Sequence, residues 1–324
     1  MPIESAPVQV RFFTIDSISL WIVERKDAKL ALSTAKNSRR WTKALVGPLL
    51  VLSACNGGSA AVKKGASATP TRVAFNPANF VDPTTSTSKF HPLRPGVKWV
   101  RGGTTEVGSR KVPHQVISTM TDVVREIDGV PVVAMLDQST DSGETAQVGY
   151  DWFALDKDGN VWLFGGYTED YEGGVYTNSA DSWLGAASGG RPGILVPGHV
   201  ELTTPRWSLG STDASKPGSV AEPAETGVTR CVAFGCFENV LVIREGEFKE
   251  IDNELKYYAP GVGIVDNVPH GASLHQDTFQ LLNVIELSPA GLAESSQIVL
   301  DLEDHARQTT PDVYRSAPRA KRLP

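Results

Sequence analysis

The chain has little positive charge and no apolar run long enough to cross a membrane. Its 324 residues contain 31 Lys and Arg against 37 Asp and Glu, which gives a net charge of −6 and a pI near 5.6. This balance argues against a general basic surface for nucleic acid. The apolar run Ala44–Ala54 has 11 residues, whereas a membrane-spanning helix needs about 20.

Motifs of the common enzyme classes are also missing. The sequence contains no G-x-S-x-G nucleophile elbow, no P-loop, and no G-x-G-x-x-G turn between a strand and a helix. Ser86-x-x-Lys89 matches a short motif of penicillin-recognising enzymes, but it lies in a polar segment without a K-T-G partner. We therefore assign no catalytic residue, expect no cofactor, and consider an enzyme the weaker hypothesis.

The segment 38–54 has the composition of a secretory signal peptide. The basic residues Arg39, Arg40 and Lys43 precede the apolar run, and small residues end it. Leu52-Ser53-Ala54-Cys55 then matches the bacterial lipobox, which predicts that Cys55 is acylated, for example with palmitate, and becomes the mature N-terminus. The competing interpretation is a buried helix with an incidental cysteine.

The flanks of this segment support export to the outer side of the membrane. Residues 1–37 are longer than a normal signal n-region, so we interpret them as a mis-annotated N-terminal extension. Residues 55–89 are rich in small and polar residues and are typical of a flexible tether. Residues 55–324 carry 23 basic and 33 acidic residues, so we expect the lipid, not the acidic body, to contact the membrane.

The two remaining cysteines are separated by four residues. Cys231 and Cys236 flank a short segment that suits a hairpin turn, and a disulfide would suit an oxidising compartment. Two free thiols are the main alternative. Zinc is the least favoured, because no second ligand pair lies at suitable spacing.

Turn residues indicate a mainly β fold. Gly (30) and Pro (21) are abundant, and short apolar or alternating runs are separated by turn signals such as Asp128-Gly129 and Asp156–Asn160. We predict a β-rich domain over residues 90–287, built as a single antiparallel meander that curls into a half-barrel or open barrel. In its last strand, residues at every second position from Phe279 to Leu287 should share one face.

One C-terminal helix should follow the sheet. Ser288 is a good N-cap and Pro289 suits the first helical position, so the helix is predicted over 288–307. Leu292, Val299 and Leu302 form a partial apolar stripe. Residues 308–324 are polar and basic, and we expect a disordered tail.

Acidic and histidine clusters favour structural interpretations. Asp156-x-Asp158-Gly159-Asn160 resembles the start of a calcium loop, but the later ligands are absent and a hairpin turn fits better. Glu169, Asp170 and Glu172 could bind a cation or act as paired carboxylates, although a solvated loop is commoner. His270 and His275 are the closest histidine pair, and no metal site is predicted from them.

Tryptophans are the last group of candidate functional residues. Trp152, Trp162 and Trp183 stand in or beside apolar strands, where such residues mostly form the core. The alternative is that they line a cavity for an apolar ligand.

Four segments resemble a group of uncharacterised bacterial exported lipoproteins. These segments are His91-Pro92-Leu93-x-Pro95-Gly96-x-x-Trp99, the stretch from Asp151 to Gly165, Arg191–Ile194 and Tyr257–Val265. The resemblance implies export but brings no known activity and no catalytic residues.

These observations favour a non-enzymatic binding or envelope-interaction module, lipid-anchored on the extracytoplasmic side of the membrane. Its partners would be the membrane, through the N-terminal lipid anchor, and an apolar ligand or an envelope protein, but not nucleic acid. A carrier for a lipid or another apolar small molecule is the first alternative. An envelope hydrolase that uses carboxylates is the second.

Overall fold

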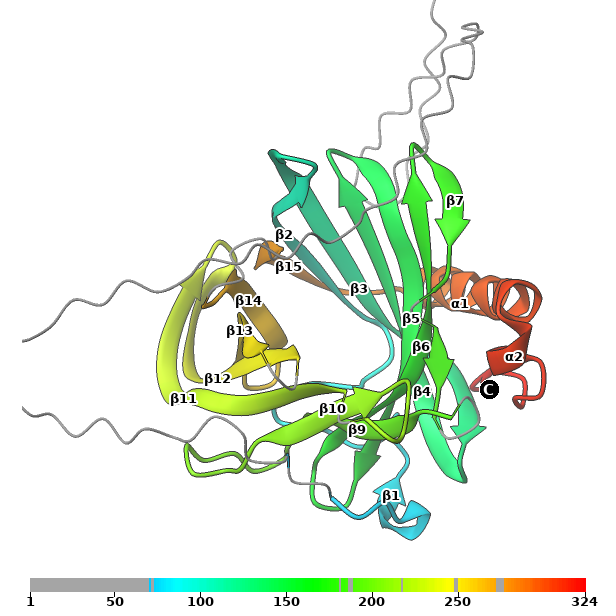
Figure 1. Cartoon of the computed structure of the whole chain (residues 1–324), viewed down its shortest axis with the longest axis horizontal. Coiled ribbons are helices and arrows are strands. Elements are labelled where there is room, and N and C mark those ends of the chain that lie inside the picture. Colours follow the sequence, from blue (N-terminus) through cyan, green and yellow to red (C-terminus); the bar gives the residue numbers. More distant parts are fainter. Residues whose placement is uncertain are drawn as a thin grey trace, which may run out of the picture. The chain divides into compact units, whose positions relative to one another are not determined.

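The structure is a computed structural model that describes residues 70, 73–180, 182–185, 189–216, 218–247, 250–271 and 277–324. Most of these residues belong to strands, with a long helix near the C-terminus (Figure 1). The proposed signal peptide and Cys55 lie outside the described residues.

The strands of the first half are β1 (Phe80–Val81), β2 (Val97–Val107), β3 (Arg110–Ile127), β4 (Val130–Asp141), β5 (Glu144–Asp156), β6 (Val161–Glu172), β7 (Val175–Asn178) and β8 (Trp183–Leu184). From β2 to β7 they pair in sequence order as antiparallel neighbours, whereas β1 pairs with β5 and β8 with β6. A short 3-10 helix, Pro77–Asn79, precedes β1.

The second half continues in the same manner. Its strands are β9 (Arg191–Val196), β10 (Trp207–Ser211), β11 (Ser219–Val232), β12 (Gly235–Glu247), β13 (Glu250–Ala259), β14 (Gly263–Pro269), β15 (Thr278–Glu286) and β16 (Lys321–Arg322). The helices are α1 (Pro289–Thr309) and α2 (Pro311–Tyr314).

Twelve of these strands form a closed antiparallel barrel. The order runs from β2 to β6, then β9 to β15, and the ring closes where β15 pairs with β2, for example Leu281 opposite Arg101. The prediction of a mainly β meander followed by a helix is confirmed. Closure depends on a pairing between segments about 180 residues apart, which the local sequence pattern does not encode.

Tight turns set the hairpins at the positions that the sequence indicates. Asp128 and Gly129 both adopt positive φ, 52° and 77°, between β3 and β4, as a two-residue turn that matches the strand twist requires. Between β5 and β6, the Asp156 carboxylate accepts bonds from the Asp158 and Asn160 backbone amides at 3.0 and 2.9 Å, and from the Trp162 indole at 2.8 Å. This carboxylate therefore stabilises a hairpin turn.

The alternation predicted for the last strand holds only at its start. Phe279 and Leu281 face the same side as Arg101, but the register shifts between Leu281 and Asn283. After this β-bulge, Val284 lies opposite Trp99 and Asn283 is exposed. The bulge places one extra residue in β15 and reverses the face of the residues that follow.

Helix α1 covers the outer face of β3 to β6 (Figure 1). Ser288 caps it, with the side-chain oxygen accepting a bond from the Gly291 amide, and Val299 and Leu302 are buried against the sheet. The helix is thus formed where its cap and apolar stripe predict.

The disordered tail predicted for residues 308–324 is wrong. Tyr314 is fully buried in α2, and its hydroxyl donates to the Gly166 carbonyl at 2.6 Å. Strand β16 then pairs with β3, and Arg322 forms an ion pair with Asp122 at 2.8 Å. Burial of a single large aromatic ring fixes a segment whose average composition is polar.

The tether is also shorter than predicted. Phe75 and Phe80 pack on the Trp162 and Phe164 rings, with centroids 5.4–6.3 Å apart. Strand β1 pairs with the end of β5. Part of the predicted tether, residues 73–89, therefore belongs to the ordered domain.

Two of the four segments that carry the resemblance, residues 91–99 and 257–265, meet at one end of the barrel. Phe90 and Leu93 are buried in the core, and the His91 ring lies 5.0 Å from the Phe153 ring. The Lys89 carbonyl accepts a bond from the Gly261 amide at 2.7 Å. Segment 89–93 therefore packs against the β13–β14 turn and fills this end of the barrel with apolar side chains.

Candidate functional site

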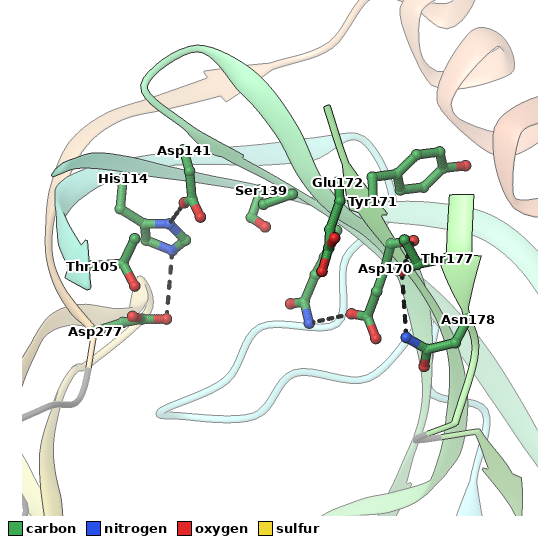
Figure 2. Close-up of a pocket in the computed structure, with 12 residues that line it drawn as sticks. Thr105, His114, Ser139, Asp141, Asp170, Tyr171, Glu172, Thr177, Asn178 and Asp277 are labelled. Carbon is green, nitrogen blue, oxygen red and sulfur yellow. Dashed lines mark hydrogen bonds and ion pairs between the residues drawn. The ribbon is translucent and has the colours of Figure 1, made fainter. Parts of the chain in front are cut away.

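The other end of the barrel holds a pocket of about 350 Å³. Figure 2 shows that its walls come from the neighbouring strands at the barrel mouth. The lining residues are almost all polar: Thr105, His114, Ser139, Asp141, Ala146, Gln147, Asp170, Tyr171, Glu172, Thr177, Asn178 and Asp277. This volume lies at the lower end of the range for small-molecule sites.

Strand register explains why these residues share one face. His114 lies opposite Asp141, Ser139 opposite Gln147, and Gln147 opposite Asp170. Directly opposed residues of an antiparallel pair point to the same side of the sheet. The alternate residues of β3 to β6 thus deliver their polar side chains to the barrel interior.

His114 is the most enclosed ionisable group of the pocket. Its residue exposure is 8 %, its Nδ1 lies 2.7 Å from an Asp141 oxygen, and its Nε2 lies 3.8 Å from an Asp277 oxygen. The two carboxylates hold the imidazole between them (Figure 2). These groups come from β3, β4 and the residue before β15. They are far apart in the sequence, so no sequence motif predicts the cluster.

A second polar layer lies deeper in the barrel. The Arg101 guanidinium bonds the Ser118 hydroxyl at 2.9 Å, and this hydroxyl donates to Asp137 at 2.5 Å. Arg101 also bonds the Ile264 carbonyl on β14 at 2.9 Å. These contacts join strands on both sides of the β2–β15 closure and place Asp137 below Ser139 on the same inner face of β4.

Burial shifts the pKa of two carboxyls in this layer. Desolvation raises the pKa of Asp137 to about 6, although Ser118 and Arg101 oppose the change. Desolvation and the nearby Asp137 charge raise the pKa of Asp151 to about 7, against the influence of Lys256. Lys256 is on β13, six strands from β5 in the ring, so Asp151 and Lys256 face each other across the interior.

Lys256 belongs to an acidic cluster on the far wall. Its ammonium lies 2.7 Å from Glu245 and 3.0 Å from Glu254, and the Tyr258 hydroxyl bonds Glu245 at 3.3 Å. Burial opposes the charged form of Lys256, but Glu245 and Glu254 outweigh it and raise its pKa well above the usual value. The interior therefore carries several charged groups below the mouth pocket.

The acidic residues singled out from the sequence divide between two environments. Asp170 and Glu172 line the pocket, whereas Glu169 points to the opposite face of β6 and is 2 % exposed. Glu169 accepts bonds from Tyr167 at 2.9 Å and Tyr171 at 2.5 Å, and it pairs with His305 of α1. These residues form part of a strand and its helix contact, so the expected solvated loop is not what the structure has.

The tryptophans proposed as cavity lining are not among the residues that line the pocket. Trp152 is fully buried, with the Arg125 guanidinium 5.1 Å from its ring centroid. Trp162 packs with Phe75 and Phe80, and Trp183 lies against the backbone at Gly210. Trp152 and Trp162 thus lie in the hydrophobic core, whereas Trp183 is half-buried.

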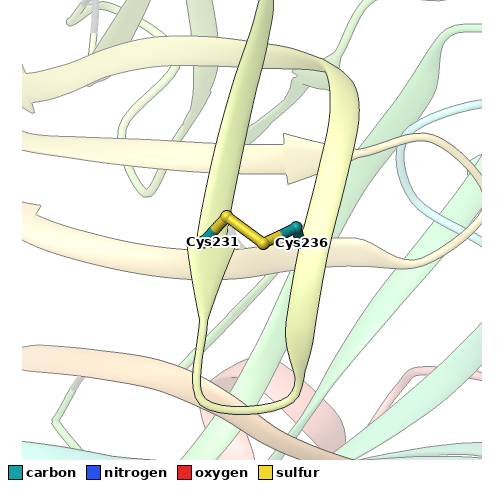
Figure 3. Close-up of a disulfide and its surroundings, with 2 residues drawn as sticks. All are labelled: Cys231 and Cys236. Atoms are coloured by element: carbon teal, nitrogen blue, oxygen red, sulfur yellow. A yellow bond between two sulfur atoms is a disulfide. The ribbon is translucent and has the colours of Figure 1, made fainter.

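The two cysteines are bonded to each other in the structure. Cys231 and Cys236 lie opposite each other near the end of the β11–β12 hairpin, with their Cα atoms 3.9 Å apart (Figure 3). His270 is not among the residues that line the pocket, and His275 lies outside the described residues. Among the described residues, no group of three or more His, Cys, Asp or Glu side chains is arranged to hold a metal ion.

The described part of the chain includes no helix with the length and apolarity needed to cross a bilayer.

Comparisons with known proteins add little to this geometry. No protein-family model matches the chain, and no curated protein matches it.

Two solved structures align with much of the chain. One is a candidate exported protein from Bacteroides fragilis with a YmcC-like fold, at 15 % identity and a TM-score of 0.35, covering 61 % of this chain and 99 % of that one. The other is a candidate lipoprotein from Parabacteroides distasonis, at 12 % identity and a TM-score of 0.31, covering 62 % and 100 %. These similarities are too low to transfer a function.

Proposed function

We propose that the protein is a non-enzymatic binding module, anchored by a lipid on Cys55 to the extracytoplasmic face of the membrane. Its ligand would be a polar small molecule held in the mouth pocket. The observation that carries this proposal is the pocket itself, where polar groups from at least five strands converge on one cavity.

The chemistry of the lining favours a polar ligand over an apolar one. Apart from Ala146 and the ring of Tyr171, every side chain in the pocket offers a hydroxyl, amide, imidazole or carboxylate. Pockets for lipids are lined mainly by apolar groups. The buried tryptophans pack elsewhere, so the lipid-carrier alternative has less support.

The anchor is supported by the lipobox Leu52–Cys55. The Cys231–Cys236 disulfide suits an oxidising compartment outside the cytoplasm. We expect Cys55→Ala to move the protein from the membrane fraction to the soluble fraction. A Cys231→Ala, Cys236→Ala double variant, which removes the other two cysteines and their disulfide, should stay in the membrane fraction. Full membrane retention of Cys55→Ala would contradict the anchor.

Native mass spectrometry of the full chain tests ligand binding. Protein extracted gently from its own host should carry a reproducible added mass that denaturation removes. Asp170→Asn should lose the adduct, because Asp170 lines the pocket. Glu294→Gln makes the same chemical change on the exposed surface of α1 and should keep it. An adduct-free wild type, or an adduct equally present in both variants, would contradict a ligand in this pocket.

An envelope hydrolase is a second candidate because Asp137 and Asp151 lie near each other below the pocket with raised pKa values, about 6 and 7. A carboxyl that stays protonated near neutral pH can act as a general acid beside an ionised partner. Hydrolysis of envelope polysaccharides by wild type, lost in both Asp137→Asn and Asp151→Asn, would support this candidate. Activity that survives both changes would exclude these carboxyls as the catalytic pair.

A further inference from the structure

The charge of the mouth pocket is strongly one-sided. Four carboxylates line it, from Asp141, Asp170, Glu172 and Asp277, and its lining includes no Lys or Arg. His114 is the single basic side chain among the lining residues. An anionic ligand would be repelled by such a lining, whereas a cation would be attracted.

Contacts within the pocket leave much of this negative charge without a cationic partner. His114 lies between Asp141 and Asp277, while Asp170 accepts a bond from the neutral Gln147 amide at 2.8 Å. Glu172 makes no hydrogen bond or ion pair with the described residues. One imidazole therefore faces four carboxylates, so charge-assisted bonding capacity remains for a ligand.

Ser139 provides an independent sign that a ligand binds here. It is 8 % exposed, and its hydroxyl has no hydrogen-bond partner among the described residues. Figure 2 shows this hydroxyl directed into the pocket, between the His114–Asp141 pair and the Asp170 side. Water can reach this hydroxyl from the pocket, and a polar atom of a ligand would take the place of that water.

We propose that the mouth pocket binds a small polar molecule that carries a primary ammonium group together with a second hydroxyl or amine. The ammonium group would donate to Asp170 and its neighbouring carboxylates, and the second group would bond Ser139. A polyamine and an amino sugar both offer this chemistry. This inference rests on the proposed function and names the class of its ligand.

Pocket size is compatible with ligands of this class. A cavity of about 350 Å³ accommodates a single sugar ring or part of a short polyamine, and it is open at the barrel mouth for the remainder. Ammonium-to-carboxylate bonds are about twice as strong as neutral hydrogen bonds. The ligand should therefore be selected by its charge first and by its hydroxyl pattern second.

Isothermal titration calorimetry on the full chain in detergent tests this class with four defined probes. Glucosamine and glucose differ mainly by one ammonium group, glucuronate carries the opposite charge, and spermidine carries ammonium groups without a sugar ring. We expect glucosamine, spermidine or both to bind at least about tenfold more tightly than glucose, and glucuronate not to bind. The tighter of the two ammonium probes distinguishes an amino sugar from a polyamine.

Variants assign the binding to the pocket. Asp170→Asn should weaken binding of the ammonium probe about tenfold, and Ser139→Ala about threefold. Glu294→Gln should leave the affinity unchanged, because it removes the same charge from the exposed surface of α1. Thermal melting curves that overlap with wild type would show that the pocket variants remain folded.

Several outcomes would overturn the ligand class. If neither glucosamine nor spermidine binds more tightly than glucose, the ammonium group has no role in binding. Equal loss in Glu294→Gln and Asp170→Asn would indicate non-specific attraction to an acidic protein, and tight binding of Ca²⁺ that displaces the organic probes would indicate a metal site. If the native adduct depends on Asp170 but no ammonium probe binds, the ligand class is wrong and the binding function stands. If no ammonium probe binds and no native adduct depends on Asp170, the pocket is not a ligand site.

Discussion

The wall formed by β3 to β6 has two faces of opposite character. Its outer face lies under α1 and the C-terminal segment, and buries large aromatic side chains such as Tyr150, Trp152 and Tyr167. Its inner face carries Ser139, Asp137 and Asp151 toward the barrel interior. Alternate residues of the same strands therefore build a dry interface on one side and a polar chamber on the other.

Charged groups on the outer face are enclosed and paired. Arg125 donates to Glu303 at 2.6 Å, with side-chain exposures of 0 % and 5 %, and the Tyr150 hydroxyl donates to the same Glu303 oxygen at 2.8 Å. Arg125 also bonds the Pro318 carbonyl. On the inner face, by contrast, Ser139 has no described partner and the pKa of Asp151 is raised. The outer polar groups hold the fold together. On the inner face Asp137 is bonded to Ser118, whereas the side chains of Ser139 and Asp151 remain available to water or a ligand.

Removing Glu303 should cause the largest loss of stability. Glu303→Ala leaves the buried Arg125 charge without its partner, so we expect the free energy of unfolding to fall by about 3–5 kcal/mol in denaturant titrations. Asp304→Ala removes the next carboxylate of α1, whose ion pair with Arg319 is exposed at 64 % and 73 %. This control should cost less than about 1 kcal/mol. Equal losses of stability in Glu303→Ala and Asp304→Ala would mean that the stability of the outer face does not depend on the buried Arg125–Glu303 pair.

Tyr314 tests whether the C-terminal segment belongs to the outer core. Tyr314→Ala removes a fully buried ring that packs 5.8 Å from Tyr167, and should lower the free energy of unfolding by about 3 kcal/mol. Tyr314→Phe removes only the hydrogen bond to Gly166 and should cost about 1 kcal/mol. Urea unfolding of both variants measures the difference. A neutral Tyr314→Ala change would show that residues 308–324 are not docked.

Removal of the Asp151 charge should have the opposite effect and stabilise the protein, because this carboxylate is buried without enough compensating interactions. The folded state raises its pKa from 3.8 to about 7, so folding binds a proton and stability falls as the pH rises from about 4 to 7. Asp151→Asn removes this penalty. We expect it to stabilise the protein by about 1–2 kcal/mol at pH 8, with little gain at pH 4.

Unfolding curves at the two pH values measure this gain. Asp158→Asn makes the same chemical change at an exposed carboxylate in the β5–β6 turn and is the matched control. If Asp151→Asn behaves in the same way as this control, the inner face does not desolvate its carboxyl.

Local signals in the sequence were sufficient for the hairpins and for α1. The turn and cap contacts there join residues only a few positions apart, so turn and capping chemistry predicts them. These segments are Asp128-Gly129, Asp156–Asn160 and Ser288-Pro289. The β15–β2 closure and the docking of Tyr314 depend on contacts with distant residues. Neither has a local signature, and the first was expected as an open edge and the second as disorder.

The pocket was only partly visible in the sequence for the same reason. Asp170 and Glu172 stood out as neighbours, but their relation to His114, Asp141 and Ser139 depends on the register of four strands. One signal was available. The last five residues of β4, Asp137–Asp141, are all polar, so polar side chains fall on the inner face of the strand as well as the outer one. A polar run that occupies both faces of a strand indicates that neither face of this part is a filled apolar core.

The most direct test of the two-faced wall is an NMR titration of the aspartate side-chain carboxyls in the full chain, with Asp137→Asn and Asp151→Asn to assign the signals. We expect the two carboxyls to titrate near pH 6 and 7, well above the usual value of 3.8 for an aspartate. Removal of one should lower the apparent pKa of the other, because they share the inner face. Completion of both titrations below pH 5 would contradict a chamber that desolvates charge, and with it the distinction between the two faces.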